Sequence, residues 1–254
     1  GLSVRAFAGW ASACATDAKV VTTPTAMKKR FDILDAWRTL AILLMLVYHF
    51  LYDLLIFGVI TPRQMFSPGL NLMQKFICGS FILLAGASAR FSRSNLRHGI
   101  IVLLAGAAVE IGAAVGGQTI RFGILQFMGV SMVLWHFTGK YFQKLPRWLL
   151  AAGSAVLYIL ADWWTGQVTV SVPWLYPLGF PNAEFTSADY FPLLPWFFLF
   201  LIGTALGGWC LDHRENKILT ASLPEALTFP GRHSLIIYLL HQPVLYGVSY
   251  LIWG

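Results

Sequence analysis

Charged residues are scarce in this chain. Asp, Glu, Lys and Arg make up 11% of its 254 residues, and hydrophobic residues make up 57%. A soluble domain carries about 25% charged residues, so the composition excludes an ordinary soluble fold and predicts an all-α integral membrane protein. Acidic residues are scarcer than basic ones, with 11 Asp and Glu against 18 Lys and Arg. Most basic residues lie in short loops between apolar runs, which indicates the positive-inside bias of membrane proteins and excludes nucleic-acid binding.

Cysteine and internal repeats are scarce or missing as well. Cys14, Cys78 and Cys210 have no paired spacing, which excludes a disulfide framework and a cysteine metal site. No internal repeat and no low-complexity tract is found along the chain. Many secondary transporters are built from inverted repeats, so this absence weighs against a transporter.

The first 26 residues contain neither an apolar run of membrane length nor the features of a signal peptide. Met27, followed by Lys-Lys-Arg, resembles a natural start. We predict that residues 1–26 form a disordered extension and that residues 27–254 form one transmembrane domain.

Seven apolar segments follow, each near the ~20 residues that a bilayer requires. They are Ile33–Phe57, Leu70–Ala89, Gly99–Val115, Ile120–Phe137, Trp148–Trp164, Phe191–Trp209 and Ser234–Trp253. The sequence therefore predicts a single bundle of about seven transmembrane helices.

Basic residues gather in alternate loops of this bundle. These are Lys28, Lys29, Arg30, Arg90, Arg93, Arg97, Lys140, Lys144, Arg147, Arg214, Lys217 and Arg232. Cytoplasmic loops carry the excess of Lys and Arg, so we expect the N-terminus inside, the C-terminus outside, and a multi-pass protein of the cell inner (cytoplasmic) membrane.

The first apolar segment carries the most informative polar residues. His49 lies deep inside it, and Asp53 follows one helical turn later on the same face. Ionisable side chains inside a membrane are costly and mark a functional site by default. The alternative is that both side chains are packing residues satisfied by neighbouring helices.

Further polar residues fall in the outer half of the predicted bundle. His49 lies about 20 Å beyond Asp35 along the helix. The others are Glu110 in the third segment, Arg121 and Gln126 in the fourth, Asp162 in the fifth and Asp189 just before the sixth. Because intramembrane polar groups face the bundle interior, we predict a polar pocket that opens outward, with His49 near its floor.

His241 is expected at a different depth. It lies about 10 Å into the last segment, which is the inner half, roughly 10 Å below His49, and argues against direct pairing of the two histidines. His241 and Gln242 line an inner passage in one interpretation. In the other, the neighbouring Pro243 kinks the helix and the role is structural.

The outer loop 165–190 is rich in Pro, Gly and aromatic residues and contains no Lys or Arg. Long loops of this kind often form a lid or a substrate mouth. A packed cap over the bundle explains the composition equally well.

Several motifs, taken in order, resemble a known family. They are Asp35-Ala-Trp-Arg-Thr-Leu-Ala41 with His49, Phe81-Ile-Leu-Leu-Ala-Gly-Ala-Ser88, Arg121-Phe-Gly-Ile-Leu-Gln126, Asp189-Tyr-Phe-Pro-Leu-Leu-Pro-Trp196 and Gly231-Arg-His-Ser-Leu-Ile-Ile-Tyr-Leu-Leu-His-Gln-Pro243. Together, from Phe31 to near the C-terminus, they resemble the bacterial acyltransferase family related to the catalytic domain of heparan-α-glucosaminide N-acetyltransferase.

The resemblance implies transfer of an acyl group, expected to be acetyl, from cytosolic acetyl-CoA to a sugar or glycan on the far side. His49 matches the histidine of the related acyltransferases and is expected to act as general base or acyl carrier. Asp53 or Glu110 would orient it, and no metal is implied. The expected acceptor-binding or oxyanion-binding residues are Arg38, Arg121, Gln126, Asp189, Trp196, His241 and Gln242. The expected ligands of the CoA phosphates are Arg90, Arg93 and Arg97.

One position departs from the lysosomal enzyme, which has Asn at the position of His49 and its active histidine further along. Here the next histidine is His98, so the lysosomal sugar substrate is not carried over.

Two other functions remain open at this point. One is a proton-coupled transporter in which His49, Asp53 and Glu110 form a relay. The other is a scaffold subunit without chemistry. The expected partners are membrane lipid, a small-molecule or glycan acceptor and a second copy of the chain, without nucleic acid.

Overall fold

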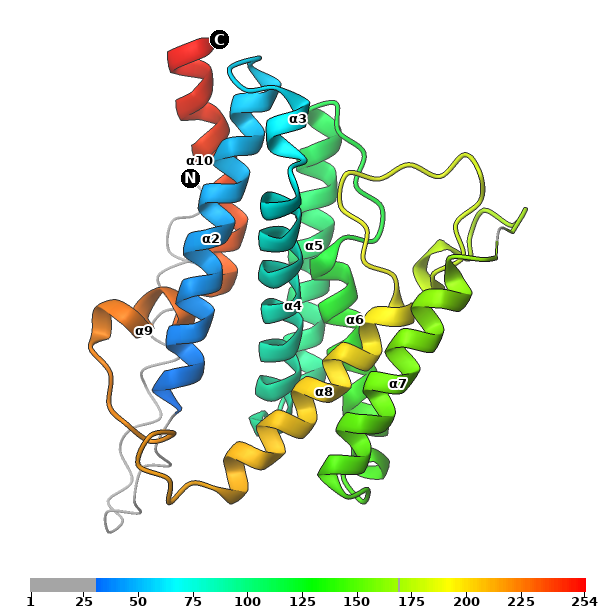
Figure 1. Ribbon diagram of the computed structural model, residues 1–254, viewed down its shortest axis with the longest axis vertical. Helices are drawn as coiled ribbons and strands as arrows, with labels where there is room; N and C mark the ends of the chain where they lie inside the picture. The colour runs from blue at the N-terminus through cyan, green and yellow to red at the C-terminus, as the bar shows by residue number, and fades with distance from the viewer. Residues whose placement is uncertain (1–30, 169) are drawn as a thin grey trace, which may run out of the picture. The chain divides into compact units, whose positions relative to one another are not determined.

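The computed structural model describes residues 31–168 and 170–254, so the predicted extension 1–26 lies outside the described residues. All regular secondary structure in the described part is helical (Figure 1). The elements are α2 (Asp32–Ile56), α3 (Pro62–Met65), α4 (Pro68–Phe91), α5 (Asn95–Val115), α6 (Ile124–Phe142), α7 (Arg147–Thr165), η1 (Tyr176–Leu178), α8 (Leu193–Asp212), α9 (Glu225–Arg232) and α10 (Ser234–Trp253).

Six described helices are long and apolar enough to cross a membrane, namely α2, α4, α5, α7, α8 and α10. They coincide with six of the seven predicted segments. The remaining segment forms α6, a helix of 19 residues that contains Gln126, His136 and Lys140 and is not among the six. The prediction of an all-helical protein with several candidate membrane spans is confirmed.

Burial separates two central helices from the others. Half of the most apolar stretch of α4 and of α8 is buried, against 11% in α5 and α10. Helices that are apolar on their exposed faces are typical of a lipid environment, where every backbone polar group is satisfied within the helix. The exposed faces of α5 and α10 are therefore the surfaces suited to contact lipid.

Small residues allow α4 and α8 to approach closely. A Cβ atom on Gly203 would collide with the backbone oxygen of Leu83, and one on Gly207 would lie 2.6 Å from the backbone oxygen of Ala87. Backbone contact of this kind requires glycine at the interface. Because the residue numbers of the two contacts rise together, α4 and α8 run in the same direction.

Helices α2 and α10 also run in the same direction. The Gly231 amide, just before α10, donates to Thr39 Oγ1 at 2.9 Å, and further along Gln242 Nε2 donates to Asp53 Oδ1 at 2.7 Å. The short helix α9 lies beside the first turns of α2 (Figure 1). Helix α10 therefore begins beside the second turn of α2, well inside the bundle.

The helix directions define two ends of the bundle. We call the end at which α2 begins, and at which Arg90 and Arg147 lie, the basic end. The opposite end holds residues 166–168 and 170–192, whose last part is bonded to the segment just before α6. The Ala188 amide donates to Thr119 O at 2.8 Å, and the Phe191 amide donates to Phe122 O at 2.9 Å. These bonds hold the end of this loop against the segment before α6 and favour a packed cap over a lid.

Candidate active site

Two histidines meet between α2 and α10. The ring centroids of His49 and His241 are 4.6 Å apart and the rings are nearly perpendicular, at 82°. The expectation that His241 lies about 10 Å below His49 is therefore wrong. It assumed that the last span begins level with α2, whereas α9 and the Gly231–Thr39 bond start α10 about two turns further into the bundle.

Backbone hydrogen bonds fix the tautomer of both rings. His49 Nδ1 lies 2.9 Å from the Met45 carbonyl oxygen, and His241 Nδ1 lies 2.6 Å from the Tyr238 carbonyl oxygen. A carbonyl oxygen only accepts, so each Nδ1 carries a hydrogen and donates it. In a neutral ring the Nε2 atom then holds a lone pair, and each Nε2 atom is a base.

Asp53 and Gln242 lie next to the histidine pair. Asp53 is fully buried and accepts from Gln242 Nε2 at 2.7 Å. The sequence predicts Asp53 or Glu110 as the group that orients His49, but the Met45 carbonyl takes that place. Asp53 instead joins α2 to α10 one turn beyond the histidines.

Three buried atoms of this cluster have no hydrogen-bond partner among the described residues. They are Asp53 Oδ2, Gln242 Oε1 and His241 Nε2. Each costs about 1–3 kcal/mol if it stays unbonded in the interior. With Asp53 ionised and His241 neutral, all three are acceptors. The cluster is thus built to receive hydrogen-bond donors.

Glu110 and Gln126 form a separate pair between α5 and α6. Gln126 Nε2 donates to Glu110 Oε2 at 3.1 Å and to the Gly106 carbonyl oxygen at 3.2 Å. No hydrogen bond in the described part of the chain joins Glu110 to His49 or Asp53. The predicted relay of these three residues is not continuous in this structure.

Asp189 connects the loop between α7 and α8 to the start of α6. Its Oδ2 accepts from the Ile124 amide at 3.0 Å and so caps the start of α6. A Cβ atom on Gly123 would collide with this carboxylate, which requires glycine there. Burial raises the pKa of Asp189 from 3.8 to about 6.

Tyr238 packs against the histidine pair, with its ring centroid 5.3 Å from that of His241. The expected place of Asp189 in one polar pocket with the histidines stays a prediction. Tyr238 was not predicted as a site residue because an intramembrane tyrosine within an apolar run carries no distinguishing pattern.

Three other predicted residues lie outside this cluster. Arg121 has an exposed side chain, and its amide donates to Ser187 Oγ at 2.8 Å. Trp196 packs against Phe191, with ring centroids 5.0 Å apart. Arg38 lies near the basic end and donates to Asp35 at 2.9 Å and to Ser88 at 2.8 Å. Their surroundings indicate roles in packing and in holding α2 in place.

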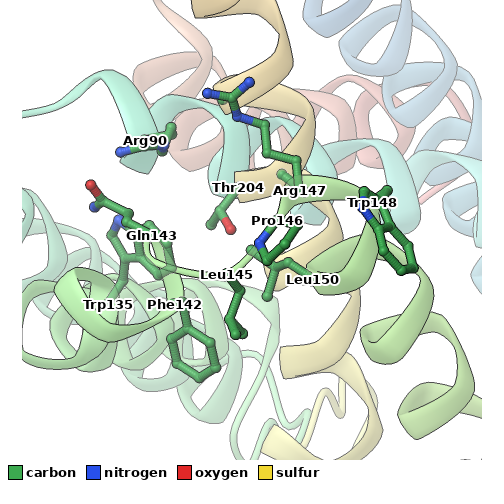
Figure 2. A pocket seen from close by; sticks show the side chains of 12 residues that line it. Arg90, Trp135, Phe142, Gln143, Leu145, Pro146, Arg147, Trp148, Leu150 and Thr204 are labelled. Atoms are coloured by element: carbon green, nitrogen blue, oxygen red, sulfur yellow. The ribbon is translucent and has the colours of Figure 1, made fainter.

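A cavity of about 390 Å³ lies at the basic end between α4, α6, α7 and α8 (Figure 2). Arg90 lines it, as predicted for an anion-binding residue, together with Arg147 and Gln143. Arg93 and Arg97 are exposed and are not among its lining residues. Arg147 is one of the basic loop residues named from the sequence, but it is not among the three expected ligands of the CoA phosphates.

The described residues contain no group of three or more His, Cys, Asp or Glu side chains that could hold a metal ion. The fold and the cluster define a polytopic helical membrane protein with paired histidine bases inside the bundle. Residues 30–243 match the family described as heparan-alpha-glucosaminide N-acetyltransferase, catalytic. The chain belongs to this family, which is one of membrane acetyltransferases. No curated protein and no solved structure matches the chain significantly.

Proposed function

We propose that the chain transfers an acetyl group from cytosolic acetyl-CoA to an amine or hydroxyl acceptor on the other side of the membrane. Three buried acceptor atoms beside His49 carry this proposal, namely Asp53 Oδ2, Gln242 Oε1 and His241 Nε2. A thioester carbonyl offers no hydrogen to them, whereas an amine or a sugar hydroxyl does. The cluster is therefore the acceptor-binding part of the active site.

His49 acts as the general base in this reaction. Its Nε2 removes a proton from the acceptor nitrogen or oxygen as that atom bonds to the thioester carbonyl carbon. The carbon–sulfur bond then breaks, and the imidazolium returns the proton to the departing CoA thiolate. Met45 O keeps the ring in the required tautomer throughout.

The helix directions support seven membrane crossings. Helices α2 and α10 run in the same direction, which requires an odd number of crossings between them. Helices α4, α5, α7 and α8 make four, and we infer that α6 is the fifth. The positive-inside rule then favours a cytosolic basic end. We therefore propose that the N-terminal side of α2 lies inside and the C-terminus outside, in the cytoplasmic membrane.

The test is acetyl-CoA turnover by purified protein with a panel of amino sugars and polyols as acceptors, read as release of free thiol. His49→Ala should lower kcat by about 10²–10⁴-fold, the usual contribution of a general base. His136→Ala is the matched control, because that histidine is exposed.

Both variants should have the wild-type elution volume in size-exclusion chromatography and the wild-type melting temperature. Turnover in His49→Ala equal to that of the control would contradict the role of His49. Proton-driven substrate flux without acetyl-CoA turnover would favour the transporter, although the separate Glu110–Gln126 pair argues against its relay.

A further inference from the structure

The proposed reaction gives no role to the cavity at the basic end. It lies between α4, α6, α7 and α8, whereas the histidine pair lies between α2 and α10. The close α4–α8 packing through Gly203 and Gly207 separates the two regions. A CoA molecule whose phosphates bound in this cavity would have to extend its acyl arm from this group of helices to α2 and α10 to reach His49.

Two arginine side chains that line this cavity approach the same glycine. A Cβ atom on Gly208 would lie 2.9 Å from Arg147 Nε and 3.4 Å from Arg90 Nε, so glycine at this position allows both side chains to approach. Arg90 and Arg147 repel each other electrostatically. Two cations held together around one glycine are typical of a site for an anion.

Only one of the two arginines is neutralised within the described residues. Arg147 pairs with Asp212, and its Nη2 donates to Asp212 Oδ1 at 2.7 Å. No ion pair with a carboxylate involves Arg90 in this part of the chain. Arg147 is also the first residue of α7, and the start of this helix has no side-chain cap. Free amides at the start of a helix favour a negatively charged ligand.

The remaining walls and the rim of the cavity are apolar. Trp135, Phe142 and Leu150 line it. Trp148 at its edge is 72% exposed, and the apolar stretch of α7 beyond it is only 17% buried. A basic pocket between helices, with a tryptophan at the membrane interface and a lipid-facing helix beside it, suits a lipid head group.

We propose that this cavity binds the phosphate of an anionic phospholipid from the cytoplasmic leaflet. Arg90 and Arg147 hold the phosphate oxygens, Gln143 contributes a polar contact, and the acyl chains run along the exposed face of α7. The site is distinct from the acetyl-transfer site, and the proposal does not depend on that activity.

The experiment compares lipid retention by the purified protein in bilayer nanodiscs of phosphatidylcholine with and without phosphatidylglycerol, read by native mass spectrometry after transfer to detergent. The wild type should retain phosphatidylglycerol in preference to phosphatidylcholine. Arg90→Gln should weaken this preference about tenfold, which corresponds to the loss of one charge-assisted contact. Arg93→Gln is the matched control, because Arg93 is exposed and does not line the cavity.

A second variant keeps both charges. Gly208→Ala should displace the two guanidiniums and weaken retention to a similar extent without changing net charge. Equal retention by Arg90→Gln and Arg93→Gln, with both proteins folded by melting temperature, would overturn the proposal. Displacement of the lipid by free CoA, together with an equal loss of CoA affinity in Arg90→Gln, would assign the cavity to the donor phosphates and would overturn it as well.

Discussion

Replacing Gly231 with Ala tests how α9 and α10 bring the two histidines together. A Cβ atom at this position would collide with the Asp35 carbonyl oxygen and lie 3.1 Å from Thr39 Oγ1. The start of α10 must then move by roughly an ångström to restore normal contact distances. That movement also disturbs the Gly231–Thr39 hydrogen bond of 2.9 Å.

The expected cost follows from these two effects. Overpacking a close contact costs about 1–3 kcal/mol, and a weakened buried hydrogen bond adds about 1 kcal/mol. We therefore expect Gly231→Ala to lower the free energy of unfolding by about 2–4 kcal/mol. Because a misplacement of about 1 Å can cost a hundredfold in rate, acetyl transfer should fall by about that factor.

The assay compares thermal unfolding and acetyl-CoA turnover in one detergent. Gly247→Ala is the matched control, because this glycine lies inside α10 and nothing lies within 4 Å of the added Cβ. Ala is the better helix former by up to about 1 kcal/mol, so the control should melt at or above the wild-type temperature with full activity. If Gly231→Ala behaves as this control does, the contact does not set the position of His241.

Two further predictions concern other contacts of the site. Gln242→Leu removes the donor to Asp53 and should destabilise the protein by about 1–3 kcal/mol, whereas the double variant with Asp53→Leu should recover most of this loss in thermal unfolding; additive losses would refute the coupling. Asp189 has a folded pKa of about 6 against 3.8, so its contribution to stability is complete below pH 4 and is lost as the pH rises through 6. The free energy of unfolding of Asp189→Asn should therefore rise by up to about 3 kcal/mol relative to that of the wild type as the pH increases from 4 to 6. A difference in melting temperature that does not vary with pH would contradict this assignment.

The long helices are predicted closely by the sequence because membrane thickness fixes their length. Helix α10 begins at Ser234 and ends at Trp253, as the apolar run predicts. Helix α9 is not predicted, because it has only eight residues and contains Pro230. Short helices in connecting segments depend on tertiary contacts, here the packing of α9 on α2, and a local apolar pattern does not encode them.

Because the sequence does not predict α9, it also gives the wrong depth for His241. Depth along a span can be counted from its first residue only if the start of the helix is known relative to its neighbours. The pairing of His241 with His49 depends on the path of residues 213–233, which includes α9. By contrast, the choice of His49, Asp53, His241 and Gln242 needs only the cost of polar groups inside an apolar helix, and the structure brings all four together.

The parallel arrangement of α2 and α10 has a consequence for the chemistry. Neighbouring residues of α10, His241 and Gln242, reach residues of α2 that are four positions apart, His49 and Asp53. A shift of α10 by one turn would separate both contacts and leave the fully buried Asp53 carboxylate without its donor. Buried polar contacts can fix the register of packed helices in this way. The bond between Asp53 and Gln242 therefore has two effects. It holds α10 at the depth where the two imidazole rings meet, and it leaves two acceptor atoms, Asp53 Oδ2 and Gln242 Oε1, unbonded near them.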